Sequence, residues 1–209
     1  MIRTITKIED LDKKRSKVYL DEEFAFVLYK GELSQYHIFL GNTIEEKVYQ
    51  QILNEILSKR AKKRCLNLLQ KKTYTEYQLR KKLKEGFYPD ELIEEAVEYV
   101  KSYHYIDDYR YACEFIFYHK DTESRKKIEE KLRKKGISQE VLQRAQDDSY
   151  DDGEEENVEL NLAIKLLEKK HYNQEIMETK EKQKLFAFLS RKGISISIIK
   201  KAMSLQDIV

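Results

Sequence analysis

The chain of 209 residues is 41% hydrophobic and 37% charged, with a net charge of only +2. It can bury a core, its small net charge means that the chain as a whole is not a polycation, and six glycines with one proline favour helices over a turn-rich β-sandwich. Cys65 and Cys113 cannot form a disulfide framework and are expected to be buried free thiols. Without a bilayer-spanning apolar run or a signal peptide, we expect a soluble, cytoplasmic protein with no membrane partner.

The first 45 residues are predicted to form a small β-hairpin region. Residues 4–8 alternate with period two, as along a strand. A second apolar-rich run over 18–28 is interrupted by the acidic triplet 21–23. This pattern predicts two strands with a hairpin turn at the triplet.

From residue 44 onward the apolar residues recur at helical spacing, and one five-point pattern occurs three times. Counted from a central leucine, its positions are −4, 0, +9, +10 and +13, and the central leucines are 49 and 57 residues apart. Such repetition is typical of tandem units stacked into an elongated array with an extended binding surface. The three copies are Leu79, Leu83, Leu92, Ile93 and Ala96; Ile128, Leu132, Val141, Leu142 and Ala145; and Leu185, Leu189, Ile198, Ile199 and Ala202.

Each copy is predicted to be a unit of three helices. The leading helices are expected over 57–69, 109–118 and 158–167, and each is followed by the two helices that carry the repeated pattern. The fold class is therefore mainly α, with three tandem three-helix repeats and a small N-terminal β-hairpin region. The predicted organisation is a strand region (1–45), a first repeat with its leading helix (46–106), a second repeat (107–147), an acidic linker (148–157) and a third repeat (158–209).

A glycine is expected to end the middle helix of each repeat. Gly86, Gly136 and Gly193 can adopt the left-handed C-cap conformation, and Pro89, Ser138 and Ser195 can then open the next helix. Gly86 lies three residues after its leucine, whereas the other two glycines lie four after theirs. We therefore interpret the turn of the first repeat as displaced by one residue.

Residues that could catalyse a reaction or bind a metal form no pattern. The four histidines are scattered and lack the spacing of a zinc site. Asp107 and Asp108 precede a helix and are explained by N-capping. The sequence contains no glycine-rich phosphate loop, nucleophile elbow or thiol pair. We therefore expect no enzyme activity, no metal and no cofactor.

The charges are segregated along the chain and indicate a cationic binding surface. Residues 57–84 contain eleven lysines and arginines against one acid, whereas residues 147–156 contain seven acids. A surface of this kind attracts polyanions or an acidic protein face, whereas the tyrosines over 99–111 are expected to be half-buried between helices. The predicted contact residues are Lys59, Arg60, Lys62, Lys63, Arg64, Lys71, Lys72, Arg80, Lys81, Lys84, Arg125, Lys126, Lys127, Arg133 and Lys134.

Several strings, taken in order, resemble the RecX family of regulatory proteins. They are VYLDEEFAF (18–26), TEYQLRKKL (75–83), YIDDYRYA (105–112) and KLRKKGI (131–137). The family commonly has a glycine-containing basic turn before the middle helix of its second repeat. The corresponding residues 119–125 of this chain contain no glycine, and Ser124 stands there between an acidic and a basic residue.

The resemblance implies a curved, helical, monomeric protein that binds the filament of the RecA recombinase on DNA and restrains its ATP hydrolysis and strand exchange. It also implies weak, sequence-independent contact with single- or double-stranded DNA. Two alternatives remain open. The chain could be a stand-alone nucleic-acid-binding module, or a helical adaptor between proteins with no nucleic-acid role.

Overall fold

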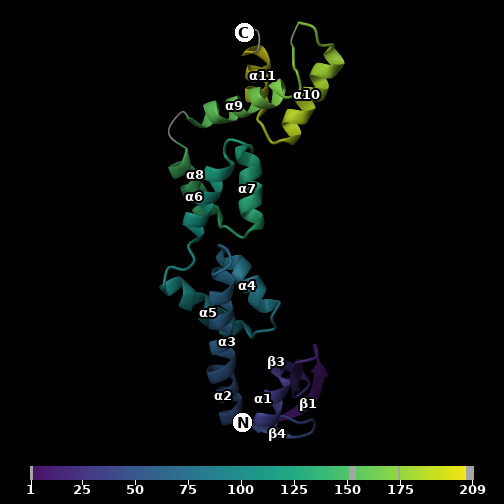
Figure 1. The fold of residues 1–209 in the computed structure, drawn as a ribbon, viewed down its shortest axis with the longest axis vertical. Coiled ribbons are helices and arrows are strands. Elements are labelled where there is room, and N and C mark those ends of the chain that lie inside the picture. The colour runs from purple at the N-terminus through teal and green to yellow at the C-terminus, as the bar shows by residue number, and fades with distance from the viewer. Residues whose placement is uncertain (1, 151–153, 174, 206–209) are drawn as a thin grey trace. The chain divides into compact units, whose positions relative to one another are not determined.

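The computed structural model describes residues 2–150, 154–173 and 175–205. The chain divides into two compact units, Met1–Asp107 and Asp108–Val209 (Figure 1). The first unit contains a sheet and one three-helix repeat, and the second contains two three-helix repeats. None of the helices within the described ranges is long and apolar enough to cross a membrane.

The N-terminal region is a four-stranded antiparallel sheet rather than the predicted two strands. Its strands β1 to β4 lie in the order β3-β2-β1-β4. The hairpin at the acidic triplet is confirmed, because Asp21 and Glu22 have φ of 48° and 70°, as a two-residue turn with the twist of the flanking strands requires. The strands span Ile2–Asp10, Arg15–Leu20, Glu23–Tyr29 and Thr43–Glu45.

Helices cover one face of this sheet. The short helix α1 (Lys30–Gln35) follows β3, and α2 (Glu46–Gln51), the π-helical stretch η1 (Ile52–Leu57) and α3 (Ser58–Leu69) follow one another without interruption beside the sheet (Figure 1). Ile5, Phe26 and Leu28 from the strands are buried together with Ile52 and Leu57 from the helical segment. This shared core holds η1, which leads directly into α3, against the sheet.

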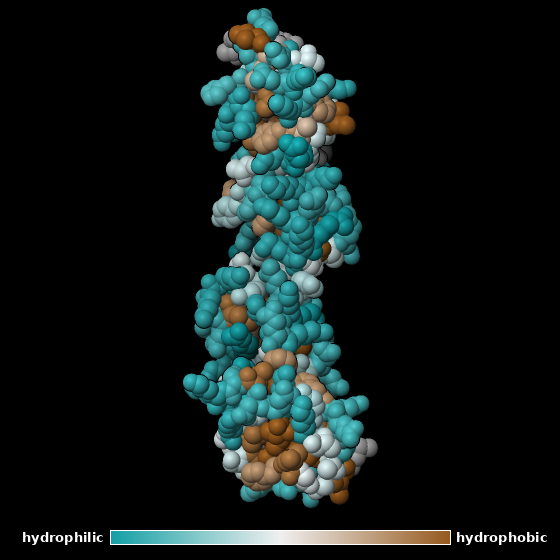
Figure 2. Space-filling model, turned by 90° about the vertical axis from the view of Figure 1, so that its right-hand side faces the viewer, coloured by the Kyte–Doolittle hydropathy of each residue, from teal (hydrophilic) through white to brown (hydrophobic). Residues whose placement is uncertain are grey.

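The surface of the sheet region retains apolar side chains. Figure 2 shows brown patches over this part of the molecule, whereas most of the remaining visible surface is hydrophilic. The exposed apolar side chains here include Ile2, Phe24, Phe39 and Leu40.

The first repeat consists of α3, α4 (Glu76–Lys84) and α5 (Asp90–Ser102). Thr75 opens α4 with a capping box, in which its side chain accepts a hydrogen bond from the Gln78 N–H and Gln78 accepts one in return. Leu79 and Leu83 face inward and are buried with residues from α3 and α5. The core therefore positions the outer faces of α3 and α4.

The second unit repeats this arrangement twice. The second repeat consists of α6 (Asp108–His119), α7 (Arg125–Lys134) and α8 (Gln139–Ser149). The third consists of α9 (Glu154–Glu168), α10 (Thr179–Arg191) and α11 (Ile196–Leu205). The predicted five-point pattern is confirmed as buried in all three repeats, with Val141 and Leu185 only half-buried, and Leu92 of the first copy packs into the core shared with the sheet.

The turn between the middle and last helices keeps one register in all three repeats, so the predicted displacement in the first repeat is wrong. The left-handed residue is four positions after the central leucine each time: Phe87 (φ 61°), Gly136 (φ 86°) and Gly193 (φ 89°). The next residue donates its N–H to the leucine carbonyl in each case: Tyr88 to Leu83, Ile137 to Leu132 and Ile194 to Leu189. A non-glycine residue takes the left-handed position in the first repeat because this backbone bond holds it there.

The predicted acidic linker (148–157) overlaps the end of α8 and the start of α9. Asp147 and Asp148 lie in the last turns of α8, and α9 already begins at Glu154. Residues 151–153 lie outside the described residues.

Candidate nucleic-acid interface

One face of α3 carries three cations without acidic partners. Lys59, Lys63 and Arg64 are exposed, and across the described ranges no carboxylate lies within ion-pair distance of them. At 100° per residue they fall on one side of the helix, because Ala61, Cys65 and Leu68 face the core. They can meet an external anion without breaking an existing pair.

The other two cations of the 59–64 cluster are already engaged. The Arg60 guanidinium forms an ion pair with Glu32 of α1 and lies 4.7 Å from the centroid of the Tyr29 ring. Lys62 Nζ lies 2.7 Å from a Glu95 carboxylate oxygen. These contacts attach α3 to its neighbours, so Arg60 and Lys62 are less available to an external anion.

The free face of α3 borders an open groove of about 960 Å³ inside the first unit. The strand β2, helix α3 and the end of α4 form its walls, with Tyr29 and the half-buried Tyr88 between them. Burial raises the pKa of the Tyr88 hydroxyl, so it stays neutral near pH 7. The charged residues of the groove are Arg15, Glu32, Glu55, Lys59, Arg60, Lys63, Arg64, Lys82 and Glu85.

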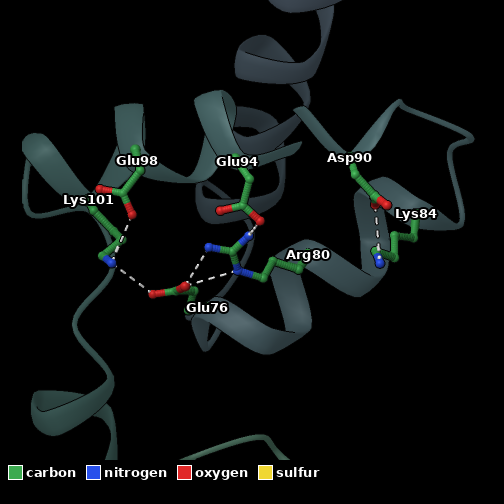
Figure 3. Close-up of polar contacts among 7 residues, drawn as sticks. All are labelled: Glu76, Arg80, Lys84, Asp90, Glu94, Glu98 and Lys101. Atoms are coloured by element: carbon green, nitrogen blue, oxygen red, sulfur yellow. Dashed lines mark hydrogen bonds and ion pairs between the residues drawn. The ribbon is translucent and has the colours of Figure 1, made fainter. Parts of the chain in front are cut away.

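The cations of α4 differ from those of α3, because several contact acids of the same repeat. Figure 3 shows the Arg80 guanidinium between Glu76 and Glu94, with Arg80 Nη2 2.7 Å from a Glu76 carboxylate oxygen. Lys84 Nζ lies 3.2 Å from Asp90. The sequence pattern places Arg80 on the outer face, but its side chain is only 24% exposed and connects α4 to α5.

Two members of this network, Glu76 and Arg80, are held in their charged forms. Partial burial would raise the pKa of Glu76, but hydrogen bonds from Arg80 and Lys101 outweigh it and keep that pKa below its ordinary value. Burial would likewise lower the pKa of Arg80, but Glu94 and Glu76 raise it. Glu76 and Arg80 therefore stay ionised at neutral pH, and the contacts of Arg80 stabilise the packing of α4 on α5.

The remaining predicted contact residues are dispersed. Lys71, Lys72 and Lys81 are exposed in the first repeat, and Lys72 Nζ lies 4.6 Å from the centroid of the Tyr74 ring. In the second repeat Arg133 pairs with Glu129 at 2.6 Å and Arg125 donates a 3.0 Å hydrogen bond to Gln146. The partner or DNA contact of these residues remains a prediction, together with that of Lys126, Lys127 and Lys134.

The unusual turn before α7 has a structural role. Ser124 is buried; its side chain accepts a hydrogen bond from the Lys127 N–H and donates one to the Lys192 carbonyl at 2.7 Å. A Cβ at Gly193 would lie 2.6 Å from Ser124 Oγ. Ser124 and Gly193 therefore connect the second and third repeats.

Sequence reasoning missed several surface residues. Arg15 and Lys82 line the groove. Arg15 is distant in sequence from the main basic cluster, and Lys82 is one of many lysines within the basic stretch. Tyr103 and Tyr105 are 57% and 55% exposed, so the expectation that they are half-buried is wrong. Their position just after an amphipathic helix, at the turn, was the available signal.

The cysteines differ in exposure. Cys65 is fully buried, and burial raises the pKa of its thiol to about 11, whereas Cys113 is half-buried. Within the part of the chain that the structure describes, no group of three histidine, cysteine or acidic side chains could hold a metal ion.

Comparison with known proteins agrees with this architecture. Models of the first and third three-helix domains of RecX match residues 61–99 and 157–203. The regulatory protein RecX of Caldanaerobacter subterraneus subsp. tengcongensis is 32% identical over 203 residues, covering 96% of this chain and 98% of that protein. The chain belongs to the RecX family. The RecX regulatory protein of Clostridium acetobutylicum is 31% identical, over 94% of this chain and 92% of its own length.

Solved RecX structures are similar as well. A crystal structure of a regulatory protein RecX matches with a TM-score of 0.61 and 28% identity, over 95% of this chain and 99% of the other. RecX from Lactobacillus salivarius matches with the same TM-score over 73% of this chain at 22% identity, which supports the fold. This chain is therefore a RecX-family regulatory protein with the predicted three-helix repeats.

Proposed function

We propose that this RecX-family protein binds the RecA filament on DNA and lowers its ATPase activity and strand exchange. The family membership supports a regulatory role, and the uncompensated cations of α3 carry the proposed contact. A filament of protein on DNA presents phosphates and acidic side chains, and Lys59, Lys63 and Arg64 can pair with either. Their open position beside the groove allows an extended ligand to pass.

A titration of RecA on single-stranded DNA with the purified protein tests this proposal. ATP turnover should fall at protein-to-RecA ratios at or below about one. The variant Lys59→Glu/Lys63→Glu/Arg64→Glu should inhibit less, because it reverses the charges that meet the filament. Unchanged turnover across the titration with the natural protein would contradict the proposal.

A second candidate function is binding of naked nucleic acid without RecA. The cationic, open groove favours it, because phosphate contacts by lysine and arginine are sufficient for sequence-independent binding. Affinity for a labelled oligonucleotide at several salt concentrations separates the two. A steep salt dependence with no effect on RecA turnover would favour the second function.

A further inference from the structure

The end of α5 carries two exposed, parallel aromatic rings. The rings of Tyr103 and Tyr105 have centroids 5.8 Å apart and an interplanar angle of 16°. Tyr99 extends this group, with its centroid 5.1 Å from that of Tyr103. More than half of the Tyr103 and Tyr105 side-chain surface is open to solvent. Ring faces are therefore available to a flat ligand.

The backbone fixes this ring pair. His104 adopts a left-handed φ of 55°, which reverses the chain after the helix. The Tyr105 N–H then donates a 3.0 Å hydrogen bond to the Val100 carbonyl, in the motif that commonly ends helices. Ile106 is buried in the core directly behind the pair. The backbone that carries the rings is thus fixed before any ligand arrives, which lowers the entropy lost on binding.

Free cations lie at the same end of the repeat. Leu92 of α5 packs with Leu57, before α3, whereas Tyr99 packs against the core that contains Leu68. Helices α3 and α5 therefore run in the same direction, and their C-terminal ends lie together. Lys71 and Lys72 follow the end of α3, and neither has an acidic partner in the described ranges.

The free face of α3 extends toward this end. At 100° per residue, Lys59, Lys63 and Gln70 fall within about 40° of one another, over a length of about 16 Å. Lys62, on the adjoining stripe, lies 5.3 Å from the centroid of the Tyr99 ring. The nearby acids Glu95 and Glu98 are paired with lysines. Free cations therefore lie at both ends of this stripe, Lys59 and Lys63 near its start and Lys71 and Lys72 just beyond its end, at the same end of the repeat as the aromatic rings.

We propose that Tyr103 and Tyr105 form a stacking platform for the unpaired bases of a single-stranded nucleic acid, whose phosphates follow the α3 cations. Aromatic rings beside a cationic track are the general means of binding single strands without reading sequence. A duplex keeps its bases stacked inside and cannot use the platform. The inference rests on the proposed function in taking nucleic acid as a ligand of the first unit.

A fluorescent reporter at the platform gives a direct test. The chain has no tryptophan, so Tyr105→Trp introduces a single indole at the site. Titration with a short oligothymidylate should quench its fluorescence, and an oligouridylate arm compares DNA with RNA. A duplex of matched length at the same ionic strength should quench less. Equal quenching by duplex and single strand, or none by either, would overturn the platform.

Substitution of both rings provides the second test. Tyr103→Ala/Tyr105→Ala should weaken oligothymidylate binding about five-fold or more, because the stacking of even one base contributes about this much. Tyr103→Phe/Tyr105→Phe should bind as the natural protein does, since stacking needs the ring and not the hydroxyl. Tyr118→Ala, which removes a 75% exposed tyrosine of the second unit, is the matched control. Circular dichroism verifies folding of each variant.

These results are separable from those on RecA. Inhibition of RecA by the natural protein, with unchanged oligothymidylate binding by the double alanine variant, would overturn the platform alone. If the double alanine variant lost RecA inhibition but bound oligothymidylate unchanged, the rings would be assigned to a protein contact, and the platform would again be overturned. Ring-dependent oligothymidylate binding without any effect on RecA turnover would support the platform and contradict the proposed filament regulation.

Discussion

Helices α3 and α4 belong to one repeat and are similarly rich in lysine and arginine, yet their charges have different surroundings. On α3, acids from neighbouring elements engage Arg60 and Lys62 and leave the outer face free. On α4, Arg80 and Lys84 contact Glu94 and Asp90 of α5. The comparison shows that a count of basic residues does not locate a binding surface. The binding surface is located by the cations that remain without an acidic partner inside the protein.

The largest expected effect concerns the core that both helices share. Leu83→Ala should reduce the free energy of unfolding by about 2–5 kcal/mol, because it empties a fully buried site on α4. Chemical denaturation measures this. Leu185→Ala, at a half-buried position of the same pattern, is the matched comparison and should cost less. An equal cost at both positions would contradict the assigned core.

The second prediction compares free with paired lysines. Lys59→Gln/Lys63→Gln should lower affinity for single-stranded DNA about ten-fold and reduce the salt slope by about 1.4, the value for two lost phosphate contacts. Lys84→Gln/Lys131→Gln changes the net charge equally but should alter the slope little, because these lysines already contact Asp90 and Glu123. Fluorescence anisotropy at several salt concentrations measures both. Identical slopes would show that only total charge matters.

The third prediction tests the structural role of Arg80. Arg80→Ala should destabilise the protein by about 1–2 kcal/mol, because Glu76 and Glu94 lose a partly buried charged hydrogen-bond donor. The adjacent exposed substitution Lys81→Ala should change stability by less than about 0.5 kcal/mol. Thermal and urea denaturation distinguish the two. If Arg80→Ala left the free energy of unfolding unchanged, Arg80 would have no structural role and would count among the free cations.

The smallest effect is a pH dependence. The pKa of Glu76 is lowered in the folded protein, so its stabilising contribution is present above the unfolded pKa near 4.5 and disappears as the pH falls through the folded pKa. Glu76→Gln should therefore be less stable than the natural protein near pH 7, and the difference should shrink below pH 4.5. Urea midpoints across this range measure the effect. A difference that is independent of pH would contradict an ionised Glu76.

Local sequence was sufficient for the repeats and their helices. The spacing of Leu83, Leu132 and Leu189 with their partners predicts three buried cores, since an inward-facing stripe has the helical period. It was insufficient for the turn of the first repeat. There a backbone hydrogen bond holds Phe87, rather than a glycine, in the left-handed conformation. It also missed part of the sheet, because a strand as short as Thr43–Glu45 has too few residues to show a period.

The sequence by itself determined the mainly helical class, the three repeated cores and the concentration of cations in the first repeat. These features follow from the order and spacing of neighbouring residues. Only the tertiary structure decided which cations are free, since Glu32, Glu94 and Glu95 reach their partners from elements distant in the chain. It also exposed the Tyr103 and Tyr105 rings, because the turn after α5 directs Ile106 rather than the tyrosines into the core.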